Sequence, residues 1–430
     1  MSLQVAKIRG IPIRLHFTLV VGVILISWTI AETLMPQMYL HQGLTNVHYW
    51  IMGVIGAAIL FISVLLHELA HSILASKYGI RVRQVTLFIF GGVSDMDEEE
   101  EEEEQTESEH GAEIRAHRSK KDFTKEFKIA LVGPLTSFII AGILALAWWT
   151  VLQIDVSNGA ETSMVSNVTP ISIAKTIVKG VLQYGTTVNV VLGGFNLIPA
   201  FPLDGGRILR YALFRIKKDY DQSTKIAVKI GISISYGFMA LGFIIMFSGA
   251  FIGGMWILFI GWFLNSGAQS YLEQRETSSI LSKIYLMDIM STKIISVSED
   301  MTVDILIKDY FNIYAKDSFP ILNDLNNNNN NNNHLIGMVT FKDAWNVPEN
   351  KRHIVKSRDI MIPLSDLIVM QQNRTANDAL IQMTRKGMGK VFVCNEEGIK
   401  LIGLVSKTDV INAARERKDY IKEISKFTAK

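Results

Sequence analysis

Long apolar runs in the first 272 residues constrain the fold of this chain more than any other feature of its sequence. A helix needs about 20 mainly apolar residues to cross the hydrocarbon core of a bilayer. The sequence therefore predicts about six membrane spans, at residues 15–34, 49–76, 127–152, 180–200, 228–248 and 251–272. Pro199 and Pro202 interrupt the fourth run. We expect a polytopic α-helical membrane domain at residues 1–275, followed by a soluble α/β part.

Composition and charge narrow the class of protein further. Of the 430 residues, 49% are hydrophobic, and the net charge is only +2. No basic stripe indicates nucleic-acid binding, so we expect no nucleic acid among the partners. The single cysteine, Cys394, excludes an intrachain disulfide and a cysteine zinc cluster, and its apolar neighbours predict a buried strand.

The distribution of lysine and arginine predicts the orientation in the membrane. Both are absent from residues 35–48 and frequent in residues 77–125 and 207–229. Cytoplasmic loops carry an excess of these residues. We therefore expect a multi-pass protein of the cell membrane with its N-terminus and its soluble part in the cytoplasm. Basic residues precede the first apolar run without a clear cleavage site, so this run is expected to remain as a span.

Two histidines and a glutamate lie together near the end of the second apolar run, in the pattern His67-Glu68-Leu-Ala-His71. On a helix, residues four apart share a face, so both imidazoles can meet one metal ion. Glu68 is placed to take a proton from a metal-bound water. An ionisable side chain in the bilayer costs roughly 2.5–3.5 kcal/mol on insertion scales, so three together indicate a metal site rather than an idle packed face.

A catalytic zinc ion usually has three protein ligands and one open position, so a third ligand must come from elsewhere in the chain. Asp204 is the candidate, because it follows the proline-broken fourth run and precedes two glycines. A broken helix at membrane depth is tolerated only where it is buried in protein or lines a watery cavity. The alternative is a plain loop aspartate at the membrane interface, but the histidine pair favours a ligand.

A short apolar segment at residues 81–93 predicts a β-strand, because it is too short to span a bilayer as a helix. It ends at Gly91 and Gly92, which suggest a turn or a close backbone approach. Seven consecutive glutamates follow at 98–104. Like charges repel, so a solvated loop is expected there, with metal gathering or partner docking as the alternatives.

Taken together, motifs spread over residues 9–272 resemble the site-2 protease family of intramembrane zinc metalloproteases. The motifs are residues 10–16, 67–71, 88–92, 133–135 and 196–207. This resemblance implies that His67, His71 and Asp204 are the zinc ligands and that Glu68 is the general base.

The resemblance also implies how a substrate is held. Asn196 would help to hold the substrate carbonyl or its oxyanion. The strand that ends at Gly91 and Gly92 resembles the family's membrane-associated β-sheet, which is thought to pair with an unwound substrate segment. A sheet edge can hold an extended segment by adding it as a strand. The acidic insertion after this strand is a departure from the family that could affect substrate access.

The soluble part contains an internal repeat, because residues 337–343 recur as residues 403–409. This pattern resembles a tandem pair of CBS domains over residues 283–415, with a C-terminal tail at 416–430. Each repeat is expected to run strand, helix, strand, strand, helix. Eight asparagines at 326–333 are expected at a hairpin tip, where a longer loop costs little.

The CBS resemblance implies an adenine nucleotide, ATP or AMP, bound between the two repeats. Asp343 and Asp409 would bond the ribose hydroxyls, with Thr340 and Ser406 near the phosphates. The alternative is that these four residues only cap the helices that follow them. A homodimer through the CBS pair is open by analogy with other such pairs.

As a whole, the sequence predicts an intramembrane zinc endopeptidase that cleaves a single-span membrane protein in regulated intramembrane proteolysis. The CBS pair would sense nucleotide and gate the cytoplasmic entrance. A transporter or channel gated by the CBS pair is one alternative, since polar groups in membranes also mark ion paths. A protease-like scaffold that binds membrane helices without cutting them is another, and the intact Glu68 speaks against it.

Overall fold

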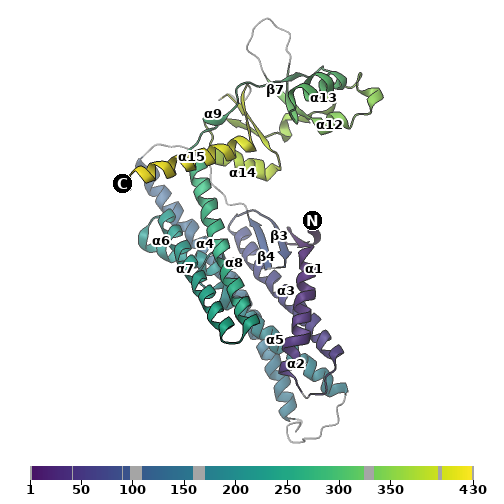
Figure 1. Cartoon of the computed structure of the whole chain (residues 1–430), viewed down its shortest axis with the longest axis vertical. Coiled ribbons are helices and arrows are strands. Elements are labelled where there is room, and N and C mark those ends of the chain that lie inside the picture. The colour runs from purple at the N-terminus through teal and green to yellow at the C-terminus, as the bar shows by residue number, and fades with distance from the viewer. Residues whose placement is uncertain are drawn as a thin grey trace. The chain divides into compact units, whose positions relative to one another are not determined.

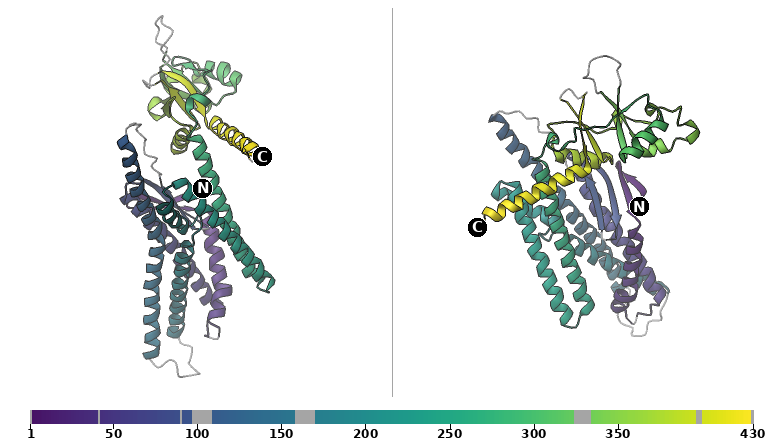
Figure 2. Two further views of the ribbon diagram at one scale, coloured as in Figure 1. Left: turned by 90° about the vertical axis from the view of Figure 1, so that its left-hand side faces the viewer. Right: turned by 45° about the horizontal axis from the view of Figure 1, so that its top comes forward.

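The computed structural model describes residues 2–40, 42–89, 91–96, 109–157, 170–323, 334–395 and 400–428. The chain divides into two compact units, Met1–Leu272 and Glu273–Lys430 (Figures 1 and 2). The domain limits expected from the sequence, at 275, 283 and 415, stay predictions. The glutamate run at 98–104 and the asparagine run at 326–333 lie outside the described residues.

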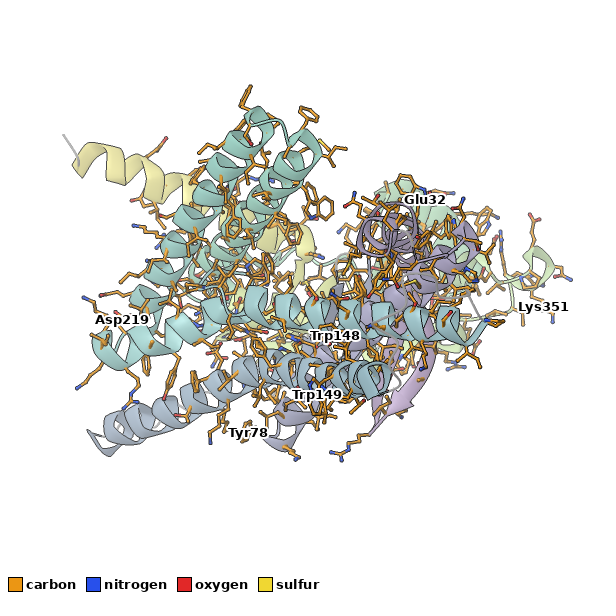
Figure 3. The ribbon with its side chains drawn as sticks, turned by 90° about the horizontal axis from the view of Figure 1, so that it is seen from below. Glu32, Tyr78, Trp148, Trp149, Asp219 and Lys351 are labelled. Carbon is orange, nitrogen blue, oxygen red and sulfur yellow. The ribbon has the colours of Figure 1, made fainter. Side chains whose placement is uncertain are left out.

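The first unit consists mainly of long helices. They are α1 (Thr18–Thr29), which continues through a π-helical turn (Ile30–Leu34) into α2 (Met35–Met38), then α3 (Asn46–Lys77), α4 (Glu109–Ser157), α5 (Pro170–Asn196), α6 (Asp204–Lys217), α7 (Tyr220–Phe247) and α8 (Phe251–Leu281). Five described segments are long and apolar enough to cross a membrane: Thr18–Met38, Asn46–Lys77, Thr124–Gln153, Tyr220–Phe247 and Phe251–Leu281. Large apolar side chains such as Trp149 project from these helices (Figure 3). Trp28, Trp149 and Trp256 are more than half exposed, as lipid-facing residues would be.

The fourth expected span, residues 180–200, is not among these five segments. The helix is present as α5, but it ends at Asn196, and it carries polar residues such as Gln183 and Asn189 within the apolar run. Its buried face packs against α3 and α4. On that face Asn189 is fully buried, and its amide donates to the Ser63 hydroxyl of α3 at 3.0 Å. A helix inside a bundle can carry such polar side chains, because they find partners on its neighbours.

A four-stranded sheet accompanies the helices of the first unit. Its strands are β1 (Ser2–Ile8), β2 (Ile11–His16), β3 (Val82–Phe88) and β4 (Gly91–Met96), in the order β1-β2-β3-β4. β2 and β3 are parallel and the outer pairs antiparallel, so β4 is an edge strand. β3 and β4 lie beside α3 (Figure 1).

The sheet differs from the expectation in two ways. The single strand expected at residues 81–93 is a hairpin of β3 and β4, because Gly91 has φ +136°, a conformation that favours glycine and lets the chain reverse. The N-terminal hairpin was not expected from the sequence. Arg9 and Gly10 both have positive φ there, as in the two-residue turns that join antiparallel strands.

The second unit contains two similar halves. The first has β5 (Val297–Ser298), β6 (Ser318–Leu322), β7 (Leu335–Thr340), α12 (Phe341–Trp345) and, added to the sheet edge, β8 (Ile362–Pro363). The second has β9 (Val369–Gln371), α14 (Ala376–Lys386), β10 (Lys390–Cys394), β11 (Leu401–Ser406) and α15 (Lys407–Thr428). In each half, a short strand is parallel to the middle strand and the last strand is antiparallel to it. This recurrence confirms the internal repeat.

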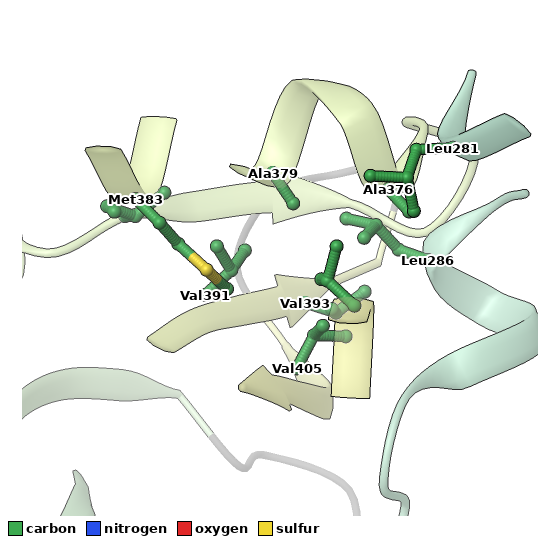
Figure 4. Packing of buried hydrophobic residues seen from close by; sticks show 10 residues of the cluster. Leu281, Leu286, Ala376, Ala379, Met383, Val391, Val393 and Val405 are labelled. Atoms are coloured by element: carbon green, nitrogen blue, oxygen red, sulfur yellow. The ribbon is translucent and has the colours of Figure 1, made fainter. Parts of the chain in front are cut away.

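Each half has its own apolar core. Figure 4 shows the core of the second half, where Val391 and Val393 of β10 meet Ala379 and Met383 of α14. Alternate residues of a strand share a face, which is why both valines point to the helix. Cys394 follows in β10 and is 1% exposed, which confirms the expected buried strand. Burial raises the pKa of its thiol, so it stays protonated.

Candidate active site

His67 and His71 lie one turn apart on α3 and face the same way. Both are buried, with 3% and 5% of their surface exposed. Asp204, the first residue of α6, approaches both rings. Its Oδ2 lies 3.2 Å from Nε2 of His67 and 3.1 Å from Nε2 of His71. The structure therefore brings together the three side chains that the sequence singled out as metal ligands.

The residues before and after Asp204 fix its position. The chain leaves α5 at Asn196 and makes a tight turn before α6 begins. A Cβ atom at Gly205 would lie 2.2 Å from the carbonyl oxygen of Ile198, and one at Gly206 would lie 2.7 Å from the backbone nitrogen of Phe201. Only glycine fits such close backbone approaches. The two glycines after Asp204 thus let α6 start directly against the turn.

Helix α4 holds the second ring nitrogen of each histidine. Nδ1 of His71 lies 2.6 Å from the carbonyl oxygen of Ile129, and Nδ1 of His67 lies 2.9 Å from Oγ of Ser137. A carbonyl only accepts, so His71 donates from Nδ1, and its Nε2 faces Asp204 as the nitrogen that would bind a metal ion. Metal-binding histidines are usually oriented through their other nitrogen in this way. Sequence reasoning missed Ser137; its only signal was a serine one turn after the Gly133-Pro134 pair in an apolar run.

Gly133 lies between these two contacts, on the same face of α4. A Cβ atom there would lie 2.1 Å from Nε2 of His71 and 2.6 Å from Nε2 of His67. From the sequence, Gly133 was only one residue of a motif that supports the family resemblance, and no role was predicted for it. Its place in the structure shows that α4 closes one side of the histidine pair and that any side chain would fill the space between the rings.

The donor set fits a zinc ion. Two imidazole nitrogens and one carboxylate oxygen form a common catalytic zinc set. In a tetrahedral site with bonds of about 2.0–2.1 Å, ligand atoms lie about 3.3 Å apart. The two distances to Asp204, 3.1 and 3.2 Å, are close to that value. One ligand atom from each of the three residues lies within 4.8 Å of the others.

Glu68 lies beside His67 on α3 and contacts strand β4. Ser94 of β4 donates a hydrogen bond from Oγ to Oε2 of Glu68 at 3.0 Å. A Cβ atom at Gly92 would lie only 2.4 Å from Cγ of Glu68. The structure thus places Gly92 against the expected general base, whereas Gly91, the first residue of β4, has the positive φ that follows the turn.

Asn196, the expected oxyanion residue, is the last residue of α5. Its Nδ2 donates to the carbonyl oxygen of Leu192 at 2.9 Å, within its own helix. An amide has two N–H groups, so a second donor remains for another partner. It lies at the end of its helix, just before the turn to Asp204, and its oxyanion role stays a prediction.

In the second unit, the expected nucleotide residues cap helices. The Thr340 hydroxyl accepts from the Asp343 backbone N–H at 3.2 Å, and the Ser406 hydroxyl accepts from that of Asp409 at the same distance. Each serine or threonine hydroxyl also donates to the aspartate carboxylate of its pair. The backbone bonds cap the N-termini of α12 and α15, and whether the four residues also bind a nucleotide stays a prediction.

A small cavity between the two halves is lined by other polar residues. Its walls include Lys293, Lys316, Lys390 and Ser318. Sequence reasoning did not single out these lysines. Its volume of about 40 Å³ is far below the roughly 300 Å³ or more of a usual ligand pocket, so the two halves would have to part to admit a nucleotide.

Comparisons with known proteins bear on both units. The model of peptidase family M50 matches residues 55–238, and the CBS domain model matches residues 286–344 and 357–416. The putative zinc metalloprotease Rip3 of Mycobacterium tuberculosis is 27% identical over 410 residues, which cover 95% of this chain and 92% of the relative. The zinc metalloprotease MJ0392 of Methanocaldococcus jannaschii is 29% identical over 412 residues, 96% of each chain. The solved site-2 protease of the same organism is 30% identical, with a TM-score of 0.36, over 63% of this chain and 94% of that one.

Proposed function

We propose that this chain cleaves membrane-spanning segments of other proteins inside the bilayer. The chain belongs to peptidase family M50 and is a membrane zinc metalloprotease with two CBS domains. One observation carries the proposal. His67, Glu68 and His71 lie within the candidate span Asn46–Lys77, and the Asp204 carboxylate meets both histidines there. A cluster of ionisable groups in such a helix indicates a functional site.

His67, His71 and Asp204 would hold the zinc ion. When bound, it supplies a Lewis acid that polarises the scissile carbonyl and lowers the pKa of a water molecule. Glu68 would accept a proton from the attacking water and pass it to the leaving amine. The second amide hydrogen of Asn196 would donate to the oxyanion that forms on the substrate carbonyl.

The substrate would bind as an extended strand on β4. A peptide bond in a helix is shielded, because its carbonyl is already hydrogen-bonded, so cleavage requires local unwinding. β4 is at the edge of its sheet and begins at Gly91 and Gly92, beside Glu68. Adding the unwound segment to this edge would satisfy its backbone groups and bring it to the general base.

The CBS pair would regulate this activity by binding ATP or AMP between its halves, on the cytoplasmic side of the membrane. Lys293 and Lys316, which line the cavity between the halves, would suit the phosphates. Lys390, in the same cavity, is instead paired with Asp317. Thr340, Asp343, Ser406 and Asp409 would contact the ribose and phosphates with the acceptor sites that their capping bonds leave free. We expect added nucleotide to change the cleavage rate of the full-length enzyme, and equal rates with and without nucleotide would contradict this part of the proposal.

The first test is metal content together with cleavage. Full-length protein purified in detergent without chelator should hold about one zinc per chain, as expected of a three-ligand site, and should cut a single-span substrate. Glu68→Gln should keep the metal and lose cleavage, whereas Asp204→Asn should lose metal as well. Glu32→Gln is the matched control, because Glu32 lies in another candidate span and accepts from Trp50 instead of meeting the histidines.

The outcomes separate the alternatives. Metal-free wild-type protein without cleavage would contradict the proposal and favour a scaffold that binds helices. Loss of activity in Glu32→Gln equal to that in Glu68→Gln would mean that any carboxylate removed from the membrane part disables the protein. Cleavage that survives Glu68→Gln would remove this residue as the general base.

A further inference from the structure

One face of strand β4 contacts helix α3, the helix that carries His67, Glu68 and His71. Alternate residues of a strand point to the same side of the sheet. Gly92 and Ser94 are two such residues, and both meet Glu68 of α3. Val93 between them is 53% exposed, on the opposite face. The face toward α3 therefore consists of a residue with no side chain and one with a short hydroxyl.

The hydrogen bonds of Ser94 have a definite direction. Its Oγ lies 3.0 Å from the Glu68 carboxylate and 3.0 Å from Oγ of Ser72, one turn further along α3. A carboxylate accepts only, so the single Ser94 proton goes to Glu68. Ser72 then donates to Ser94. The result is a chain from the Ser72 hydroxyl through Ser94 to Oε2 of Glu68, in which Ser72 is fully buried.

We propose that Ser94 is a positioning residue for Glu68, which fixes the plane of its carboxylate from the strand on which the substrate pairs. With Oε2 held by Ser94, the other oxygen has a defined direction for proton transfer. Gly92 lies close to the same side chain, since a Cβ atom there would lie only 2.4 Å from Cγ of Glu68. This inference rests on the proposed protease function.

The arrangement couples substrate pairing to the base. β4 is bonded to β3 on one side, and its other edge is where a substrate strand would add. Pairing on that edge restrains β4 and, through Ser94, the carboxylate of Glu68. The Glu68 carboxylate would then be ordered best when an extended substrate segment is paired with β4. Proton transfer by Glu68 would therefore occur mainly while substrate is bound.

The size of the effect follows from the kind of bond. A hydrogen bond to a charged group, lost at a residue that must be well oriented for proton transfer, changes a rate by about 10- to 100-fold. The change should appear in kcat, because Ser94 acts through Glu68 and not through the substrate. KM and zinc content should stay near the wild-type values.

The test uses the isosteric pair Ser94→Thr and Ser94→Val in the full-length enzyme, with a single-span substrate in detergent. Threonine keeps the hydroxyl and valine replaces it by a methyl group, while both suit a strand. We expect Ser94→Thr to retain most of kcat and Ser94→Val to lose about 10- to 100-fold, with KM and zinc within about twofold. Ser72→Ala removes a hydroxyl of the same chain without touching the carboxylate, so it should lose much less.

Three results would overturn the inference. Equal kcat values for Ser94→Thr and Ser94→Val would show that the hydroxyl is not used. An equal loss in Ser72→Ala would mean that the chain only fastens β4 to α3. A rise in KM at unchanged kcat would make Ser94 a substrate contact. A wild-type enzyme that binds zinc but cuts no substrate would instead refute the proposed function, on which the role of Ser94 depends.

Discussion

Gly133 offers the sharpest test of how the metal site is built, through the single substitution Gly133→Ala. A methyl group at this position would lie 2.1 Å from Nε2 of His71 and 2.6 Å from Nε2 of His67. Non-bonded heavy atoms prefer about 3.5 Å, so the His71 ring would have to retreat by about 1 Å or more. It cannot do so freely, because its Nδ1 is bonded at 2.6 Å to Ile129 of the same helix α4.

The expected magnitude comes from the bonds that this retreat would break. Loss of an outer hydrogen bond to a metal-binding histidine typically costs about 10- to 100-fold in metal affinity. Both histidines are displaced in Gly133→Ala, so we expect at least about 100-fold weaker zinc binding and a matching loss of cleavage. The substitution should also stabilise helix α4 locally, because alanine favours the helix interior over glycine by about 1 kcal/mol of free energy. The clash of the methyl group with the two rings costs typically about 1–3 kcal/mol, so the metal-free protein should unfold at a slightly lower temperature than the wild type while remaining folded.

The assay compares zinc affinity, by competition with a chelator, with the unfolding temperature of the metal-free protein. Gly142→Ala is the matched control, because Gly142 lies on the same helix, is exposed and has no atom within 4 Å of a built Cβ. It should bind zinc as the wild type does. Zinc affinity of Gly133→Ala within about threefold of the wild type would refute the reasoning, since even one displaced histidine should cost more.

Three further predictions concern other parts of the chain. Ser137→Ala removes the partner of His67 Nδ1 and should weaken zinc binding about 10-fold or more, measured by the same chelator competition. Gly205→Ala would place a methyl group 2.2 Å from a backbone carbonyl and should abolish zinc binding by displacing the start of α6, whereas Gly194→Ala, with open space around it, should not. In the second unit, burial raises the pKa of Asp317, but the hydrogen bond and charge of Lys390 outweigh it, so the net pKa is lowered. The pair therefore stabilises the folded state above the pKa of an unfolded aspartate and loses this contribution as the pH falls through the lowered value. Because Asp317 is mostly exposed, Lys390→Gln should lower the free energy of unfolding by less than about 1 kcal/mol at neutral pH and by nothing in acid.

The sequence could predict the parts of the site that depend on local spacing. His67 and His71 share a helix face because they are four residues apart, and the structure places them so. Asp204 was indicated by the broken run before it, since prolines cannot continue a helix and a carboxylate at such a break needs a partner. In both cases the chemistry is carried by side chains whose type is rare in apolar surroundings.

Other parts of the site could not be predicted, because their sequence signals are common ones. The partner of His71 is the backbone carbonyl of Ile129, and a carbonyl is present at every residue. Ser137 and Ser94 are serines, which occur in many helices and strands without any role. The N-terminal hairpin has an exposed first strand, β1, and its turn at Arg9-Gly10 is a weak signal in the sequence.

Several departures from regular structure lie around the two histidines in the first unit. Pro134 interrupts the hydrogen bonding of α4 next to Gly133, where that helix comes closest to the histidines. The turn before Asp204 and the positive φ of Gly91 bring the third ligand and β4 to the same point. Sequences tend to break local rules at functional sites and compensate elsewhere. A glycine–proline pair inside an apolar helix was therefore a signal that α4 contributes to the site, and the Gly133→Ala and Ser137→Ala variants test whether that contribution is orientation of the two histidines.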